Sequence, residues 1–319
     1  MTIGQHILIT GSNGFVGRHL SATLIARGAR VSKIVRPGKL LEQTAGGQYA
    51  IDLVDRDSVL RVFDLLQPTY VVHLASSKYR GDDSVQRRDA YIENLSTSLN
   101  LIDACRAVTN FQRMIFLGTC DEYGSVDPPY NEKQSPMPTN GYGVSKLAVT
   151  KILLELCERH QFPSVVLRPT VIYGPGQSDD MFVSTLIRSL LAGSHFETTL
   201  GGQTRDFVYV DDVVEAVIKA LLVGDRSNGM IVNIGSGQSI TIREVATMVA
   251  DMIGPRAIDL LRFGSIPYRL NEVMNYSASI VRARERLGWV PQTSLRDGLL
   301  RTVQSFRNFA DEVLSGNHA

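Results

Sequence analysis

The stretch Gly11-Ser12-Asn13-Gly14-Phe15-Val16-Gly17 decides the fold. It follows a short apolar run, Gln5 to Thr10, and precedes Arg18 to Arg27, whose apolar residues recur with helical spacing. In a strand, turn and helix of this kind, glycines let backbone amides approach a pyrophosphate at the positive end of the helix. The sequence therefore predicts a dinucleotide site at this turn, formed by Gly11, Asn13, Gly14, Phe15, Val16 and Gly17.

The alternation of strands and helices continues along the chain. Further strands are expected at Arg30 to Val35, Tyr49 to Leu53, Tyr70 to Ser76, Met114 to Leu117 and Ser164 to Leu167, with helical stretches between them. Units of this kind predict an α/β fold, a doubly wound parallel (Rossmann) sheet with right-handed crossovers. We expect a dinucleotide domain at residues 1–167 and about 207–236, and a smaller α/β substrate domain at about 168–206 and 237–319.

The second half of the chain has fewer clear patterns. We expect Asp211 or Asp212 to cap a helix at Val213 to Leu222, and Thr241 to cap the next helix, with Glu244 three residues on. A short strand is expected near Ile258 to Leu261, then helices around 279–287 and 295–314. Between these helices, Trp289 and Pro291 are expected to fix packing.

Composition narrows the class of protein. The 319 residues are 44% hydrophobic and 20% charged with a formal net charge of +1, which indicates one large or two modest globular domains. Such a balance favours neither nucleic acid nor membrane as a partner. Cys105, Cys120 and Cys157 lack metal-ligand spacing and no leader precedes them, so we expect a cytoplasmic protein without a metal site. No apolar run approaches the roughly 20 residues that span a bilayer.

The residues after the second strand bear on cofactor choice. An NAD-specific site places an acidic residue there, on the adenosine ribose. This chain instead has Val35, Arg36 and Pro37, with Lys39 close behind. Because a guanidinium suits a 2′-phosphate, NADP(H) is favoured over NAD(H), although Arg36 could also be a solvated loop residue.

Other cofactor contacts are expected at the ends of the next strands. Asp52 and Leu53 follow the third strand near the adenine, and small residues after the fourth would let the backbone lie close to a cofactor. His73, inside that apolar run, is interpreted as a core histidine. Asn94, on a helix at 89–107 that also carries Asn100, is a candidate contact or an ordinary surface amide. The candidates here are Asp52, Leu53, Leu74, Ala75, Ser76 and Asn94.

Tyr142 and Lys146 should lie one helical turn apart on one face of a helix. A cation within about 5 to 6 Å favours the charged form of a tyrosine, which lowers its pKa and lets the phenol exchange protons near neutral pH. Thr119 or Cys120 would lie at the carboxyl edge of a parallel strand, where open α/β sheets bind ligands. The spacing is weak evidence alone, so its context decides.

These motifs occur in an order that resembles the extended short-chain dehydrogenase/reductases, over essentially the whole chain. The likeness is greatest to the branch that modifies nucleotide-diphosphate sugars: 4-epimerases, 4,6-dehydratases, decarboxylases and 4-keto-6-deoxysugar reductases. The residues that carry it are Thr10 to Gly17, His73 to Ser76, Thr119 to Gly124, Tyr142 to Lys146, Arg168 to Pro175, Arg205 to Asp212 and Gly288-Trp289.

The resemblance implies a catalytic triad at Thr119, Tyr142 and Lys146. Tyr142 would transfer a proton, Lys146 would hold the nicotinamide ribose and lower the tyrosine pKa, and Thr119 would hydrogen-bond the substrate oxygen. The resemblance also implies a homodimer formed through helices that include the Tyr142 helix. Substrate contacts are expected at Thr119, Cys120, Asp121, Val171, Arg205 and Arg269, the two arginines clamping the diphosphate unless they are surface ion-pair partners.

Three departures from the family pattern guide the choice of reaction. Cys120-Asp121 replaces the Asp-Glu pair of the dTDP-glucose dehydratases, which makes elimination less favoured, although Asp121 and Glu122 keep it open. Val171 replaces an asparagine near the sugar diphosphate, and Val35-Arg36 replaces the acidic ribose residue of NAD-retaining epimerases.

The prediction is therefore NADPH-dependent reduction of a nucleotide-linked 4-keto-6-deoxyhexose. A segment similar to that of GDP-4-keto-6-deoxymannose reductases, Gly118 to Gly124, adds a modest hint. The alternative is a 4-epimerase with tightly bound NAD. A 4,6-dehydratase and a non-catalytic dinucleotide-sensing protein are carried as weaker hypotheses.

Overall fold

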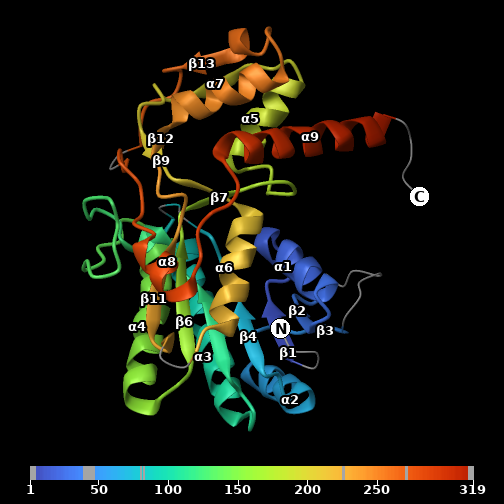
Figure 1. The fold of residues 1–319 in the computed structure, drawn as a ribbon, viewed down its shortest axis with the longest axis vertical. Coiled ribbons are helices and arrows are strands. Elements are labelled where there is room, and N and C mark those ends of the chain that lie inside the picture. Colours follow the sequence, from blue (N-terminus) through green and yellow to red (C-terminus); the bar gives the residue numbers. More distant parts are fainter. Residues whose placement is uncertain are drawn as a thin grey trace.

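Seven parallel strands form the central sheet of the computed structural model, which describes residues 5–38, 47–79, 81, 83–224, 227–269 and 272–314. Lys39 lies outside these residues. The strands run in the order β11-β6-β5-β4-β1-β2-β3, so the chain reverses direction across the sheet beside β1, as doubly wound folds do (Figure 1). Their bounds are β1 His6–Thr10, β2 Arg30–Val35, β3 Gly47–Ala50, β4 Tyr70–His73, β5 Arg113–Leu117, β6 Ser164–Pro169 and β11 Met230–Ile234.

Helices cover both faces of this sheet, so the central strands are buried on both sides and read as continuous apolar runs. One face packs against α1 (Phe15–Ala26) and α6 (Val210–Leu222). The other packs against α2 (Arg56–Leu66), α3 (Ser84–Ala107) and α4 (Gly141–His160). The α/β class and the parallel sheet predicted from the sequence are confirmed.

A smaller part lies beyond the carboxyl ends of the strands, at the top of Figure 1. Its helices α5, α7 and α9 share one apolar core. The strands pair as β7 with β10, β9 with β12, and β8 with β13. The bounds are β7 Val171–Tyr173, α5 Phe182–Leu191, β8 Phe196–Thr198, β9 Thr204–Arg205, β10 Phe207–Tyr209, β12 Ile240–Thr241, α7 Ile242–Ile253, β13 Leu261–Phe263 and α9 Leu295–Leu314. The short helix α8 (Val281–Leu287) packs instead in the core of the central sheet, beside β11 (Figure 1).

Trp289 joins this smaller part to the sheet. Its side chain is fully buried, and its indole N–H donates to the backbone oxygen of Asp212 at 2.9 Å. The Asp212 carboxylate also accepts the backbone N–H groups of Gln292 and Thr293. The packing role predicted for Trp289 is confirmed.

Two local predictions are wrong. Helix α6 begins at Val210 with Tyr209 as its N-cap, so neither Asp211 nor Asp212 caps it; the Asp212 carboxylate is used by the chain before α9 instead. The segment from Ile258 to Leu260 is a 3₁₀ turn, and the strand β13 begins only at Leu261. The Thr241–Glu244 capping box, in contrast, is present as predicted.

Candidate functional site

A cavity of about 600 Å³ opens at the carboxyl ends of the central strands. It lies where the strand order reverses, the usual ligand position in this kind of sheet. The cavity brings together every residue predicted for the cofactor: Gly11, Asn13, Gly14, Phe15, Val16, Gly17, Arg36, Asp52, Leu53, Leu74, Ala75, Ser76, Asn94, Tyr142 and Lys146.

The glycine turn is packed too closely for side chains. A Cβ on Gly17 would lie 2.2 Å from the oxygen of Gly11, and one on Gly11 would lie 2.7 Å from the nitrogen of Ala75. Gly11 also has a φ of +68°, which favours glycine. No side chain caps α1 and its first turn holds no acidic residue, so its amides remain available to an anion. These features fit a dinucleotide pyrophosphate.

The loop after β4 is held by Asn94 of α3. The Asn94 amide is buried, accepts the backbone N–H of Ser77 at 2.7 Å, and donates to the hydroxyl of Ser145 on α4 at 2.9 Å. The interpretation as a surface amide is therefore wrong: Asn94 lines the cavity and ties this loop to both helices. Asn100 is also buried and donates to the backbone oxygen of Leu53.

His73 is a satisfied core residue, as predicted. Its ring nitrogens lie 2.8 Å from the Thr10 hydroxyl and 3.0 Å from the Ser98 hydroxyl. Burial, followed by the nearby positive charge of Lys146, lowers its pKa to about 3. A neutral imidazole therefore packs behind the cavity.

Tyr142 and Lys146 face the cavity from the first turns of α4. Asn140 caps this helix by accepting the N–H of Gly143, which fixes where the two side chains emerge. The Lys146 ammonium donates to the backbone oxygen of Leu117 at 2.7 Å and lies 5.8 Å from the centre of the Tyr142 ring. The structure thus brings the phenol and the ammonium together.

Burial lowers the pKa of Lys146 to about 7. The carboxylate of Glu122 opposes that shift, and the ammonium of Lys78 adds to it. Lys146 is therefore poised to change its charge near neutral pH. Both lysines line the cavity, although Lys78 carries no motif that would have drawn attention to it.

Thr119 stands at the carboxyl end of β5 and caps the 3₁₀ turn at Cys120–Glu122. Its hydroxyl oxygen accepts the N–H of Asp121 at 3.1 Å, a bond that does not use the hydroxyl proton. The backbone N–H of Thr119 donates to the Glu122 carboxylate at 3.1 Å. This geometry fixes a hydroxyl in the cavity wall, beside the two residues from α4.

Glu122 anchors the wall from behind. Its fully buried carboxylate accepts the Thr150 hydroxyl at 2.9 Å and pairs with the buried Arg168 guanidinium, whose Nη2 lies 2.7 Å away. Gly118 leaves room for it, because a Cβ there would lie 2.4 Å from its Oε1 atom. Glu122 does not line the cavity, so only Asp121 remains as an acid for the elimination chemistry that the sequence left open.

Comparison with known proteins identifies the family. Residues 7–235 match the model of the NAD dependent epimerase/dehydratase family. The chain belongs to this family. It is 28% identical to dTDP-6-deoxy-L-talose 4-dehydrogenase (NAD(P)(+)) of Kitasatospora kifunensis, over 95% of this chain and 97% of that protein. It is also 28% identical to GDP-6-deoxy-D-mannose reductase of Pseudomonas aeruginosa, over 92% and 95% of the two chains.

Solved structures agree with this assignment. The crystal structure of UDP-glucose 4-epimerase with UDP-glucose from Thermotoga maritima superposes with a TM-score of 0.87 at 27% identity, covering 96% of this chain and all of that one. This epimerase/dehydratase family member is therefore an NAD(P)-dependent enzyme of the group that modifies nucleotide sugars.

The cavity wall of this family member also includes Tyr276, which the sequence did not single out. Its phenol donates to the Asp121 carboxylate at 3.2 Å, and both residues line the cavity. Burial, followed by the negative charge of Asp121, raises the pKa of Tyr276 well above its ordinary value. Tyr276 lies in a segment without helical or strand periodicity, so no pattern indicated it.

Three of the predicted substrate residues do not line this cavity, whereas Thr119, Asp121 and Val171 do. The Cys120 thiol is fully buried and donates to the backbone oxygen of Arg168 at 3.2 Å, so it contacts the wall rather than a ligand, a correction to the sequence prediction. Arg205 pairs with Glu272 and donates to the backbone oxygen of Val273. Arg269 is exposed.

After β2, Arg36 pairs with Glu93 of α3. The Arg36 side chain lines the cavity and is 69% exposed, so the structure leaves both interpretations of Arg36 open. Glu93 was not predicted, because nothing in the pattern of α3 distinguishes it from other polar residues of the helix.

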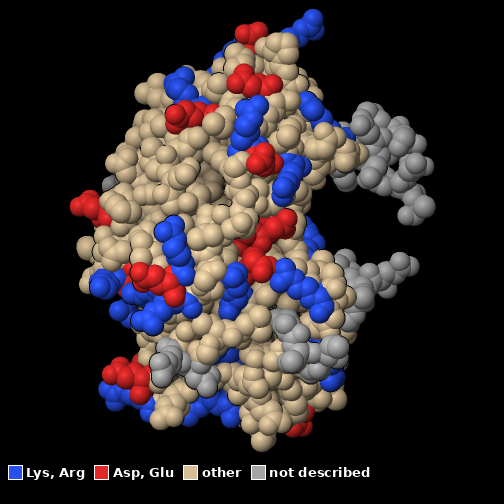
Figure 2. All heavy atoms as spheres, in the orientation of Figure 1, with Lys and Arg blue, Asp and Glu red and all other residues tan. Residues whose placement is uncertain are grey.

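Two findings concern other kinds of site. No helix among the described residues combines the length and apolar character needed to cross a bilayer. Over the same residues, no group of three His, Cys, Asp or Glu side chains is placed to hold a metal ion. Acidic and basic residues are interspersed over the face shown in Figure 2.

Proposed function

We propose that this chain reduces the carbon-4 ketone of a nucleotide-diphosphate 6-deoxyhexose, with NADP(H) favoured over NAD(H). The observation that carries the proposal is the placement of Thr119, Tyr142 and Lys146 on one cavity wall with the glycine turn. When bound, the nicotinamide supplies the hydride. The ketone oxygen accepts the Thr119 hydroxyl proton as a hydrogen bond and takes a proton from Tyr142.

Lys146 supports this transfer through its charge. Protonated Lys146 stabilises the phenolate that remains on Tyr142 after proton transfer, and it is held in place by the oxygen of Leu117. The low pKa that burial gives Lys146 means that its ammonium is easily lost in the free protein. A bound anionic dinucleotide would favour the charged form.

The sugar-facing residues support a reductase over a dehydratase. Elimination of water needs an acid at the position of Asp121, and here this carboxylate is one methylene shorter than the family's glutamate and accepts the phenol of Tyr276. Glu122 is committed to Arg168. Arg36 is the observation that favours NADP(H), because its guanidinium lies at the adenosine end of the cavity.

A 4-epimerase is the second candidate, favoured by the likeness to UDP-glucose 4-epimerase across the whole chain. Purified protein mixed with NADPH and GDP- or dTDP-4-keto-6-deoxyhexose should lose NADPH absorbance in proportion to the sugar added. An epimerase would instead arrive with tightly held oxidised dinucleotide and interconvert UDP-glucose and UDP-galactose without net consumption. The second result would replace the reductase proposal.

The proposal includes the assignment of two domains with different binding roles. Residues 1–167 and about 207–236 would bind the dinucleotide, and about 168–206 and 237–319 the sugar nucleotide. Arg205 and Arg269 would contact the diphosphate; neither lines the cavity, although the Arg205 guanidinium lies 5.7 Å from the centre of the Tyr276 ring, which does. The three cysteines, all free, support a cytoplasmic location.

We also propose a homodimer formed through α3 and α4. Val85, Ile92 and Leu99 lie seven residues apart on α3 and are 63%, 45% and 40% exposed, and Val144 of α4 is 42% exposed. Residues at this spacing share one face of a helix. Sedimentation of wild type and of Leu99→Glu tests the idea, since a dimer held there should become a monomer in the variant.

A further inference from the structure

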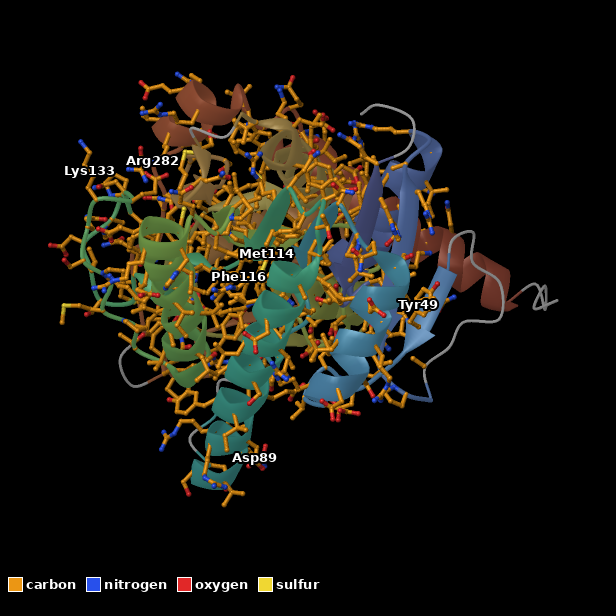
Figure 3. The ribbon with its side chains drawn as sticks, turned by 90° about the horizontal axis from the view of Figure 1, so that it is seen from below. Tyr49, Asp89, Met114, Phe116, Lys133 and Arg282 are labelled. Carbon is orange, nitrogen blue, oxygen red and sulfur yellow. The ribbon has the colours of Figure 1, made fainter. Side chains whose placement is uncertain are left out.

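A second hollow of about 490 Å³ adjoins the adenosine end of the main cavity. It shares Arg36, Asp52 and Glu93 with that cavity, so a group at the adenosine ribose would face both spaces. In Figure 3, Asp89, one of its lining residues, stands near the projecting end of α3. The hollow is lined by Arg36, Pro37, Asp52, Val54, Asp89, Ile92 and Glu93.

The charges around this hollow are unbalanced. Among the described residues that line it, Arg36 is the one cation, whereas Asp52, Asp89 and Glu93 are carboxylates. The Arg36 guanidinium is already paired with Glu93 across the gap between the β2 loop and α3. A 2′-phosphate would therefore have to compete with the Glu93 carboxylate for the Arg36 guanidinium.

We propose that Glu93 determines how strongly this site distinguishes NADP(H) from NAD(H). The inference rests on the proposed dinucleotide site. With the ion pair formed, Glu93 offers a carboxylate that a ribose hydroxyl can donate to, which replaces from α3 the acidic residue missing after β2. With the pair broken, Arg36 is released to a 2′-phosphate. Glu93 thus limits the NADP(H) preference that Arg36 alone would give.

The size of the effect follows from the exposure of the pair. The Arg36 and Glu93 side chains are 69% and 36% exposed, and ion pairs of such exposure contribute about 0.2 to 1 kcal/mol, or up to about fivefold in affinity. We therefore expect Glu93→Gln to raise the ratio of NADP⁺ affinity to NAD⁺ affinity by about 1.4-fold to fivefold.

Titration calorimetry with NADP⁺ and NAD⁺ on full-length protein, stripped of bound nucleotide, measures this ratio. Asp89→Asn is the matched control, because Asp89 lines the same hollow without an ion pair to Arg36 in the described residues. A rise in Glu93→Gln that is absent from Asp89→Asn supports the proposal. An unchanged ratio in Glu93→Gln, or an equal rise in both variants, overturns it.

The Arg36→Ala background tests the route of the effect. If Glu93 acts by holding Arg36, then Glu93→Gln should change the ratio by less than half as much when Arg36 is already alanine. A full-sized effect in that background overturns the ion-pair explanation. Since only dinucleotide binding is measured, loss of sugar reduction would not affect these outcomes, whereas a failure to bind either dinucleotide would disprove the proposed function itself.

Discussion

The dinucleotide wall of the cavity and its sugar-facing wall differ in how far apart in the sequence their residues lie. The first is built mainly from one turn, Gly11 to Gly17, closed against the loop at Ala75. The second depends on pairs such as Asp121 with Tyr276, which are 155 residues apart. A local motif can be read from a sequence, whereas a pair joined only by the fold cannot. The comparison shows why the cofactor can be named from sequence before the sugar.

Replacing Tyr142 by phenylalanine should separate the two walls most sharply. Removing the proton donor should lower kcat for sugar reduction by about 10²- to 10⁴-fold, since general acid catalysis contributes that much. Dinucleotide affinity should change less than about threefold, because the glycine turn is untouched. Single-turnover reduction of the keto-sugar and calorimetry with NADP⁺ measure the two quantities.

The matched control is Tyr49→Phe, which removes a phenol from β3, outside the residues that line the cavity (Figure 3). Sugar turnover that survives in Tyr142→Phe at the level of this control would mean that the phenol is not the proton donor. The non-catalytic dinucleotide-sensing hypothesis would then replace the enzyme proposal.

A second prediction concerns Glu122, whose carboxylate accepts the backbone N–H of Thr119 and so supports the cavity wall at that residue. Replacing Glu122 by alanine leaves the Arg168 guanidinium buried and unpaired, which should cost about 3 to 5 kcal/mol of unfolding free energy. Chemical denaturation measures the change. Glu122→Gln keeps a hydrogen-bond acceptor for Thr119 and should recover part of the loss. Equal stability of the alanine variant and wild type would contradict the buried-pair argument.

The sequence predicts features that lie within one segment of the chain better than features that depend on segments far apart. The strand and helix alternation follows from periodicity and the glycine turn is a local motif, so the fold was predictable, as was the set of residues that line the cavity around this turn. The spacing of Tyr142 and Lys146 placed them correctly because a single helix carries both. Glu93, Lys78 and Tyr276 were missed, since their roles depend on which elements the fold places side by side. Asp212 was misassigned because its bonds go to Gln292 and Thr293, far along the chain.

A third prediction uses the depressed pKa of Lys146, which lies between the two walls. Its pKa is about 7 in the folded protein and 10.5 when exposed, so the unfolded state binds more protons between these values. Stability should therefore rise with pH above 7, by at most about 1.4 kcal/mol per pH unit from this group. Urea unfolding between pH 6 and 10, in wild type and Lys146→Met, should show that the variant loses this slope. An unchanged slope would mean that Lys146 does not titrate there.

The smallest expected effect is that of a substitution at Tyr276, which tests whether the two walls of the cavity act independently. Replacing it by phenylalanine removes one hydrogen bond to Asp121 while leaving the ring that packs against Tyr130, so stability should fall by only about 0.5 to 1.5 kcal/mol. Because Tyr276 faces the sugar side, KM for the sugar nucleotide should change while the Kd for NADP⁺ should not. If KM for the sugar nucleotide and Kd for NADP⁺ changed by the same factor, the two walls would be energetically coupled. Such coupling could pass through Asp121 and Thr119, because the Asp121 N–H donates to the Thr119 hydroxyl at the start of the 3₁₀ turn. The two walls would then differ only in how far apart their residues lie in the sequence, and not in how they affect ligand binding.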